Sequence, residues 1–346
     1  KETYTFEDRG SDLLTLRPEG TAPVCRAYIQ HGMHNRPQPI RLYYVGDFFR
    51  YDRPQSGRYR QFSQFGIELI GEPDASADLE IIQMAQTLLK SVGVADESIL
   101  INSIGDSACR LTYIDKLRSY YSSHDSELIH SDCKRRLVTN PLRLLDCKNT
   151  TCQRLINGAP SSIEYLCKFC LEHWQSLLDK LELLGIRYAI DKRLVRGLDY
   201  YSRTVFEIVP REEGQQNTLV AGGRYDGLIE LLGGPSTPGV GFAMGIERVL
   251  SAMQNNQAEI PADNQLKIVV AHIGDSSISS GIVLASELRG SGISVLTAPT
   301  GRGLKSQLRY ASSVNASHAI IIGDLEIEKG TVMLRDLINS EQREVS

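Results

Sequence analysis

The chain has 346 residues, of which 41% are hydrophobic and 23% are charged, and this length and balance are typical of a globular protein with two domains. The formal net charge at pH 7 is -4, which excludes an overall positive field, so a nucleic acid would have to meet local Arg and Lys side chains. The sequence has no apolar run of membrane-spanning length and no signal-peptide pattern, so we expect a cytoplasmic protein. Residue 1 is a lysine, and we therefore expect the reading frame to begin further upstream.

The first segment predicts a strand that leads directly into a helix. Residues 13–18 have strand composition, and residues 22–32 have apolar side chains at helical spacing. Thr21 belongs to the residue types that cap helix N-termini, and we predict it as the N-cap. Glu19 and Thr21 would then both lie at a junction between a strand and a helix.

Two long β-rich segments follow, residues 40–53 and 58–71. The turn-forming residues between them predict an antiparallel hairpin, which we place in the centre of a sheet. On the second strand the two-residue period places Gln64, Gly66 and Glu68 on one face. Gly66 would leave space for a small ligand between the amide and the carboxylate. A solvated sheet face with a bulge is the alternative.

The rest of the chain divides into a helical segment, a return to β structure and a second domain. Residues 106–184 are mostly helical and polar and resemble an inserted module. Further elements of the first domain are predicted at 78–92 (helix), 98–104, 204–209 and 218–221 (strands) and 239–248 (strand into helix). After a polar linker at 254–265, residues 266–346 alternate strands and helices, which predicts an α/β domain.

The chain contains seven cysteines, and reduced thiols are expected. Six of them lie between residues 106 and 184. Together, Cys147, Cys152, Cys167 and Cys170 could supply four thiolates to a structural zinc ion. Ordinary helix and loop cysteines are the alternative, and the sequence leaves the choice open.

Residues 193–207 concentrate charge immediately before a strand. Three cations, two acids and the adjacent phenols Tyr200 and Tyr201 surround Gly197. The pattern is compatible with a charged surface loop or with a functional site. Arg50, Arg58, Arg196 and Arg248 come from separate segments that flank the same predicted sheet. Several arginines around a polar pocket suit a nucleoside triphosphate, and the sequence has no P-loop pattern that would bind one differently.

The chain resembles the class II aminoacyl-tRNA synthetases, and among them the histidyl-tRNA synthetases. Residues 49–62 resemble the second sequence motif of this class, and residues 241–248 resemble its third motif. Segments 16–21, 193–201 and 221–227 are similar to segments of the histidine enzymes, and all five lie in the family's order. The resemblance implies an α+β fold, in which residues 1–105 and 185–253 form a catalytic domain with an antiparallel sheet flanked by helices. Residues 106–184 would form a helical insertion in this domain. Residues 254–265 would be a linker, and residues 266–346 would form an α/β anticodon-binding domain.

The resemblance also implies ATP-dependent ligation of histidine to tRNA(His) through a histidyl-adenylate. It implies a catalytic set of Arg196, Arg50 and Glu19. The histidine would be bound by Glu19, Thr21, Gln64, Glu68, Tyr200, Tyr201 and Tyr225. ATP would be bound by Arg50, Arg58, Arg196 and Arg248, with Mg²⁺ bridging its outer phosphates. Arg196 would stand where related enzymes use a metal ion, and no protein metal ligands are implied.

For tRNA, the resemblance implies that Arg53 and Gln55 contact the acceptor end. A homodimer is also implied, although the first class motif, which builds its interface, would lie before residue 1. Asp52 departs from the family, which usually has glutamate there. A regulatory paralogue that charges no tRNA is the alternative function. The presence of Glu19, Arg196, Tyr201 and Arg248 favours the enzyme.

Overall fold

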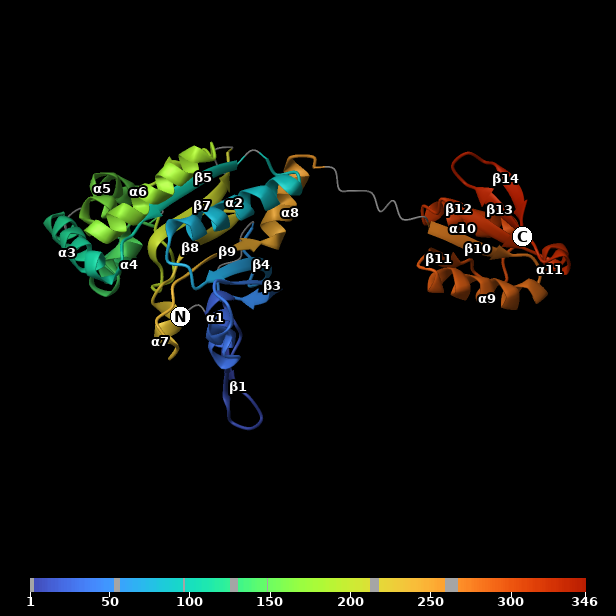
Figure 1. Ribbon diagram of the computed structural model, residues 1–346, viewed down its shortest axis with the longest axis horizontal. Helices are drawn as coiled ribbons and strands as arrows, with labels where there is room; N and C mark the ends of the chain where they lie inside the picture. Colours follow the sequence, from blue (N-terminus) through green and yellow to red (C-terminus); the bar gives the residue numbers. More distant parts are fainter. Residues whose placement is uncertain are drawn as a thin grey trace. The chain divides into compact units, whose positions relative to one another are not determined.

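The computed structural model describes residues 3–52, 57–95, 97–124, 130–147, 149–211, 218–258 and 267–346. The chain divides into two compact units, residues 1–259 and 260–346 (Figure 1). None of the helices in the described ranges combines the length and the apolar composition that a bilayer crossing requires.

A seven-stranded sheet forms the scaffold of the first unit, with the strand order β3-β4-β9-β8-β7-β5-β6. The strands are β3 (Ile40–Phe49), β4 (Gln61–Ile70), β5 (Glu97–Ser103), β6 (Ala189–Ile190), β7 (Ser202–Pro210), β8 (Val220–Arg224) and β9 (Gly239–Gly245). Neighbouring strands are antiparallel except β5 and β6, which are parallel. The predicted antiparallel sheet is therefore confirmed.

The β3–β4 hairpin forms as predicted, with Tyr44 directly opposite Gly66. Its predicted place in the centre of the sheet is wrong, because β3 is an edge strand among the described residues. The edge position leaves Tyr43 and Val45 exposed, by 75% and 63%. Before the hairpin, the chain forms the short strands β1 (Thr5–Glu7) and β2 (Leu13–Thr15) and the 3-10 turn η1 (Met33–Asn35).

Helices cover both faces of the sheet (Figure 1). One face carries α2 (Ala75–Ser91), α6 (Lys168–Leu183) and α8 (Ile246–Asn255), and the other carries α1 (Thr21–Gln30) and α7 (Leu228–Leu231). On the first face Leu177 of α6 packs with Phe206 and Phe242 of the strands. Trp174, the only tryptophan of the chain, is buried in the same core, so its fluorescence reports on the first unit alone.

A helical module is inserted between β5 and α6. It consists of α3 (Ser107–Ser123), α4 (Ser131–Thr139), η2 (Pro141–Leu144), α5 (Thr150–Gly158) and η3 (Ser162–Tyr165). Tyr113, Leu117, Leu144 and Leu155 belong to a small core of its own. By contrast, α6 packs in the core of the sheet. We therefore propose that the module ends before α6 rather than at residue 184.

A buried ion pair connects α2 to the end of β8. Asp78 and Arg224 are both fully buried, and the Arg224 Nη2 atom donates to Asp78 Oδ2 at 2.5 Å. Burial alone would raise the pKa of Asp78, but the charge and hydrogen bonds of Arg224, with those of His173, lower it to about 2. Arg224 also donates to the backbone carbonyls of Glu72 and Asp74. These bonds fix the chain immediately before Tyr225.

We expect Asp78→Asn to destabilise the first unit by about 3 kcal/mol, because the guanidinium of Arg224 would stay buried with only the part-exposed Asp226, 3.1 Å from its Nη1 atom, as a counter-charge. Urea unfolding followed by Trp174 fluorescence measures this loss. Asp115→Asn on α3 is the matched control, because the exposed Asp115 pairs with Arg118 only at 3.8 Å. Equal midpoints for the two variants would contradict a structural role for the buried pair.

The second unit is an α/β domain with the sheet order β11-β10-β12-β13-β14. Its elements are β10 (Lys267–His272), α9 (Ser276–Gly290), β11 (Ser294–Thr297), α10 (Leu304–Ser313), β12 (His318–Ile322), α11 (Asp324–Lys329), β13 (Val332–Asp336) and β14 (Gln342–Val345). The pairs β10–β11 and β10–β12 are parallel. The sequence did not predict α11 or β14, because elements of six and four residues are too short to show a clear period.

Candidate functional site

A buried carboxylate lies at the centre of the candidate site. Glu68 on β4 is fully buried and pairs across the sheet with Gly241 on β9. A Cβ atom on Gly241 would collide with this carboxylate, so only glycine fits there. The hydroxyls of Thr21 and Tyr225 donate to its two oxygens, each at 2.7 Å. Burial raises the pKa of Glu68 to about 8, although both hydrogen bonds favour the ionised form.

The start of α1 supplies a second carboxylate. Glu19 accepts hydrogen bonds from the backbone amides of Thr21 at 2.7 Å and Ala22 at 3.1 Å. The prediction that Thr21 is the N-cap is wrong, because α1 already begins at Thr21, whose hydroxyl is directed to Glu68. The carboxylate of Glu19 instead satisfies the first amides of the helix. Burial raises the pKa of Glu19.

Three tyrosines line the space between these carboxylates. The rings of Tyr200 and Tyr201 lie 4.8 Å apart, and Tyr200 meets Tyr225 edge to face at 6.2 Å. The Tyr200 hydroxyl donates to Glu19 at 3.3 Å. The structure therefore brings the predicted Glu19, Thr21, Glu68 and all three tyrosines together, although they come from four separate segments of the chain.

Tyr44 is a site residue that the sequence reading missed. Its ring lies against Gly66, where a Cβ atom would overlap it, so the prediction that Gly66 leaves space for a ligand is wrong in this structure. Among the described residues, the buried Tyr44 hydroxyl and Gln64 Oε1 have no hydrogen-bond partner. Unpaired buried polar atoms of this kind are costly unless a ligand or water meets them. The register of the predicted hairpin could have identified Tyr44 as a site residue, because it places Tyr44 opposite Gly66.

Arg196 is held by a carboxylate that the sequence did not assign. Its Nη1 atom donates to Glu207, and its guanidinium lies 5.6 Å from the centre of the Tyr201 ring. The other oxygen of Glu207 accepts from the Thr218 hydroxyl at 2.9 Å. The Thr218 carbonyl in turn accepts from Arg248 Nη1 at 2.9 Å. The buried Nε atom of Arg196 has no partner among the described residues.

The remaining arginines converge near Arg248. Burial lowers the pKa of Arg248, and the nearby positive charges of Arg58 and Arg50 lower it further. Arg50 donates to the Pro18 carbonyl at 2.8 Å, and Arg58 lies 3.7 Å from Asp52. Cations that repel one another at a part-buried site favour a polyanion. Arg53 and Gln55, predicted for the acceptor end, lie outside the described residues.

Side chains of the helical module hold the loop that carries Arg196. Arg143 donates to the Gly197 carbonyl and Asn140 to the Asp199 carboxylate, both at 2.6 Å. Arg110 donates to the Asp199 carbonyl at 3.2 Å. Asp199, which had no assigned role in the sequence, is therefore an anchor of the loop.

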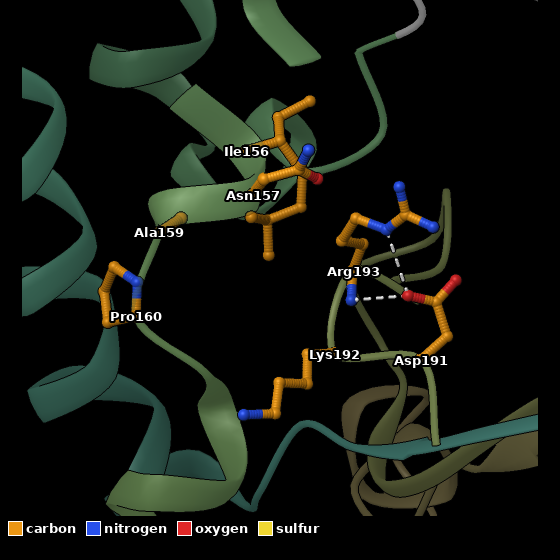
Figure 2. Close-up of a pocket in the computed structure, with 8 residues that line it drawn as sticks. Ile156, Asn157, Ala159, Pro160, Asp191, Lys192 and Arg193 are labelled. Atoms are coloured by element: carbon orange, nitrogen blue, oxygen red, sulfur yellow. Dashed lines mark hydrogen bonds and ion pairs between the residues drawn. The ribbon is translucent and has the colours of Figure 1, made fainter. Parts of the chain in front are cut away.

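A pocket lies where this loop begins, between residues 156–160 of the module and residues 191–193 (Figure 2). Asp191 accepts from the backbone amide of Arg193 at 3.0 Å and from its Nε atom at 3.2 Å. These two bonds indicate that Arg193 stabilises the local conformation of the loop. None of the residues predicted to bind histidine or ATP lines the pocket, so we do not assign it to either substrate.

Comparison with known proteins places these features in one family. The family model described as histidyl-tRNA synthetase matches residues 1–249. The chain belongs to the histidyl-tRNA synthetase family. A second model, described as an anticodon binding domain, matches residues 267–346. The resemblance inferred from the sequence motifs is therefore confirmed.

Individual members of the histidyl-tRNA synthetase family agree with this placement. The histidine–tRNA ligase of Dehalococcoides mccartyi is 50% identical over 342 residues, which are 99% of this chain and 82% of that protein. The crystal structure of apo S. aureus histidyl-tRNA synthetase is 37% identical with a TM-score of 0.84 and covers 99% of this chain and 84% of its own. A Bacillus halodurans structure, described as an ATP phosphoribosyltransferase regulatory subunit/histidyl-tRNA synthetase, covers 93% of this chain and 83% of its own. At 22% identity and a TM-score of 0.63 it shares the fold alone.

Proposed function

We propose that the chain activates L-histidine with ATP and transfers it to tRNA(His). A carboxylate oxygen of histidine attacks the α-phosphorus of ATP, and diphosphate leaves. A hydroxyl of the terminal tRNA ribose then attacks the acyl carbon, and AMP leaves. The observation that carries the proposal is the buried Glu68, with two hydroxyl donors, at one end of a site whose other end holds Arg196.

Glu68 and Tyr201 are proposed to recognise the imidazole, with Tyr200 and Tyr225 beside them. A ring with one donor and one acceptor nitrogen requires partners of both kinds, and a site of this kind rejects isosteres that lack either nitrogen. Glu19, Thr21 and Gln64 are proposed to bind the α-amino group. The unpaired Gln64 Oε1 atom supports this role, because an ammonium supplies the donor that it lacks.

The four arginines are proposed to bind ATP. Arg50 and Arg196 would contact the α-phosphate, while Arg58 and Arg248 would lie toward the outer phosphates. The unpaired Nε atom of Arg196 supports this placement, because it is a donor that a phosphate oxygen can meet. The charge of Arg196 would stabilise the negative charge that develops at phosphorus.

Mg²⁺ binds mostly phosphate oxygens and water, with one or two protein carboxylates. Glu207 fits that need, because its carboxylate lies between Arg196 and the Thr218 backbone that holds Arg248. When bound with ATP, the ion would neutralise charge on the leaving diphosphate. We propose Glu207 as its protein ligand.

We further propose a cytoplasmic homodimer. The edge strand β3 exposes Tyr43 and Val45, and a second copy of the chain could cover them. Reduced thiols at all seven cysteines, together with dependence on ATP and tRNA, support a cytoplasmic setting.

Histidine-dependent exchange of labelled diphosphate into ATP tests the proposed enzyme against a regulatory paralogue. The enzyme is expected to exchange label only when histidine is present. A folded protein that binds histidine but exchanges no label would support the paralogue.

Changing Gln55 to alanine is expected to lower charging of tRNA(His) and to leave diphosphate exchange intact, because its proposed partner is the tRNA acceptor end. Both rates are measured on one preparation. Equal losses in the two assays would refute that placement. The parallel variant Gln175→Ala on α6, whose exposed amide donates to Asp179 at 2.9 Å, controls for loss of a surface amide.

A further inference from the structure

Four potential metal ligands meet inside the helical module. His130 precedes α4, Cys133 lies in its first turn, Cys147 follows η2, and Cys152 lies in α5. One ligand atom of each, the His nitrogen and three Sγ atoms, lies within 4.8 Å of every other. His130 Nδ1 is 3.4 Å from Cys133 Sγ and 3.7 Å from Cys147 Sγ, and the Sγ atoms of Cys133 and Cys152 are 3.7 Å apart. We refer to these residues as the module cluster.

A second group lies where the chain enters and leaves the module. Asp106 and Cys109 are at the start of α3, and Cys167 and Cys170 are at the start of α6. Their ligand atoms also lie within 4.8 Å of one another. Asp106 uses Oδ1 to cap α3, while Oδ2 is 3.8 Å from Cys167 Sγ. The Cys167 amide donates to Cys109 Sγ at 2.9 Å. We refer to this group as the junction cluster.

These distances match a tetrahedral ion rather than a disulfide. Two thiolates about 2.3 Å from one tetrahedral zinc ion are about 3.8 Å apart, and a thiolate and an imidazole nitrogen are about 3.6 Å apart. A disulfide would bring two sulfurs to about 2.05 Å. The observed separations of 3.7 Å and 3.4 Å in the module cluster agree with the first geometry. Soft thiolate ligands with one nitrogen or oxygen select zinc among the divalent ions common in cells.

We propose that the chain binds two structural zinc ions, one in the module cluster and one in the junction cluster. The single zinc site suggested by the sequence, built from Cys147, Cys152, Cys167 and Cys170, is wrong. The fold separates its two pairs and gives each pair different partners. Two of those partners, His130 and Asp106, are not cysteines, and the cysteine spacing therefore could not reveal them.

The two ions would have separate structural effects. The module has a small hydrophobic core of its own, to which three of the module-cluster ligands belong. A structural metal ion stabilises a domain most when its hydrophobic core is small. The junction ion would tie the first turn of α3 to the first turn of α6. Arg110 follows Cys109 directly and donates to the loop that carries Arg196. The junction ion would thus fix the position of this donor.

The test is the metal content of the full-length protein, purified without chelators and measured by mass spectrometry of the elements. About two zinc ions per chain are expected, falling to about one in Cys147→Ser, about one in Cys170→Ser and almost none in the double variant. Cys25→Ser is the control, because Cys25 lies in α1 and is buried in another core, and the variant should retain both ions. Wild-type protein without zinc, iron in its place, or equal loss in the control would overturn the proposal. A variant that keeps both ions would overturn the site it alters.

If a serine variant is insoluble, the wild-type protein still decides the question. Co²⁺ exchanged into the protein is expected to give the thiolate charge-transfer and visible bands of tetrahedral cobalt, and their absence would overturn both sites.

The positioning role of the junction ion rests on the proposed function, whereas the metal content does not. We expect Cys170→Ser to lower the kcat of diphosphate exchange more than Cys147→Ser does, with a smaller change in the KM for histidine. Equal rates in two variants that have each lost one ion would overturn the positioning role and leave the metal sites standing.

Discussion

Arg196→Ala is expected to lower histidine-dependent diphosphate exchange by about 10²–10³-fold, with little change in histidine binding. Removing a positioned charge from a transition state of this kind costs about 3–4 kcal/mol. The guanidinium is placed for phosphate by its bond to Glu207 and by its unpaired Nε atom. Exchange kinetics and calorimetric titration with histidine measure the two effects separately.

Arg193→Ala is the matched control for this change. Arg193 lies in the same loop, but its side chain pairs with Asp191 and is half-exposed. Its exchange rate should stay close to that of the unchanged chain. Arg196→Lys should recover part of the lost rate, because it restores a charge opposite Glu207 without the planar fork. A parallel loss of exchange and histidine binding in Arg196→Ala would contradict the proposed role at the α-phosphate.

The second large effect is expected for Glu68→Gln. Loss of a carboxyl group that the bound imidazole is expected to keep ionised should weaken histidine binding by about 10–100-fold, because hydrogen bonds to charged groups contribute about 1.5–3 kcal/mol. The amide oxygen can still accept from one of the two hydroxyls of Thr21 and Tyr225, and the amide NH2 can donate to the other hydroxyl oxygen, so the site should keep its shape. Glu80→Gln on α2 controls for the loss of a carboxylate, because Glu80 is bound to Arg41 at the surface. Histidine affinity that is the same in both variants would contradict recognition by Glu68.

The same variant should change how stability depends on pH. Burial raises the pKa of Glu68 from 4.5 in the unfolded chain to about 8 in the fold. The folded state therefore retains a proton that the unfolded state loses. The stabilising contribution of this proton is fully present below pH 4.5, and it is lost as the pH rises to about 8. Within that window Glu68 contributes a slope of about -1.4 kcal/mol per pH unit to the free energy of unfolding.

Glu68→Gln removes this slope, so the variant should gain stability relative to the unchanged chain between pH 5 and pH 8. Urea unfolding followed by Trp174 fluorescence at several pH values measures the difference in the first unit. Parallel pH dependences in the two proteins would show that Glu68 is ionised throughout this range.

Sequence periodicity was enough to predict the main elements of the sheet and the helices around it. The two-residue period placed Gln64 and Glu68 on one face, and the structure has both on the side of α1. The motifs alone are enough to identify the family. These signals are local or depend on the order of segments, which a single sequence displays directly.

What the sequence missed depends on distances between segments. In the sequence Glu207 is one acid among several charged residues, and only the folded arrangement of β7 and the loop shows that it binds Arg196. Tyr44 had the composition of an ordinary strand residue, and only pairing across the hairpin places its ring over Gly66. Thr21 has the chemistry of an N-cap, but a buried carboxylate competes for its hydroxyl. Each error reflects tertiary contact overriding a local preference.

The attachment of the Arg196 loop has a consequence for shortening the chain. Arg110, Asn140 and Arg143 all donate to that loop, and all three belong to the helical module. The module has its own core, and a deletion that rejoined β5 to α6 would remove from the core of the sheet the partly buried Ile163 and Leu166. A minimal enzyme made in this way would also lose three donors to the backbone and side chains around Arg196. Such a shortened enzyme would need new contacts to the Arg196 loop in order to keep its activity.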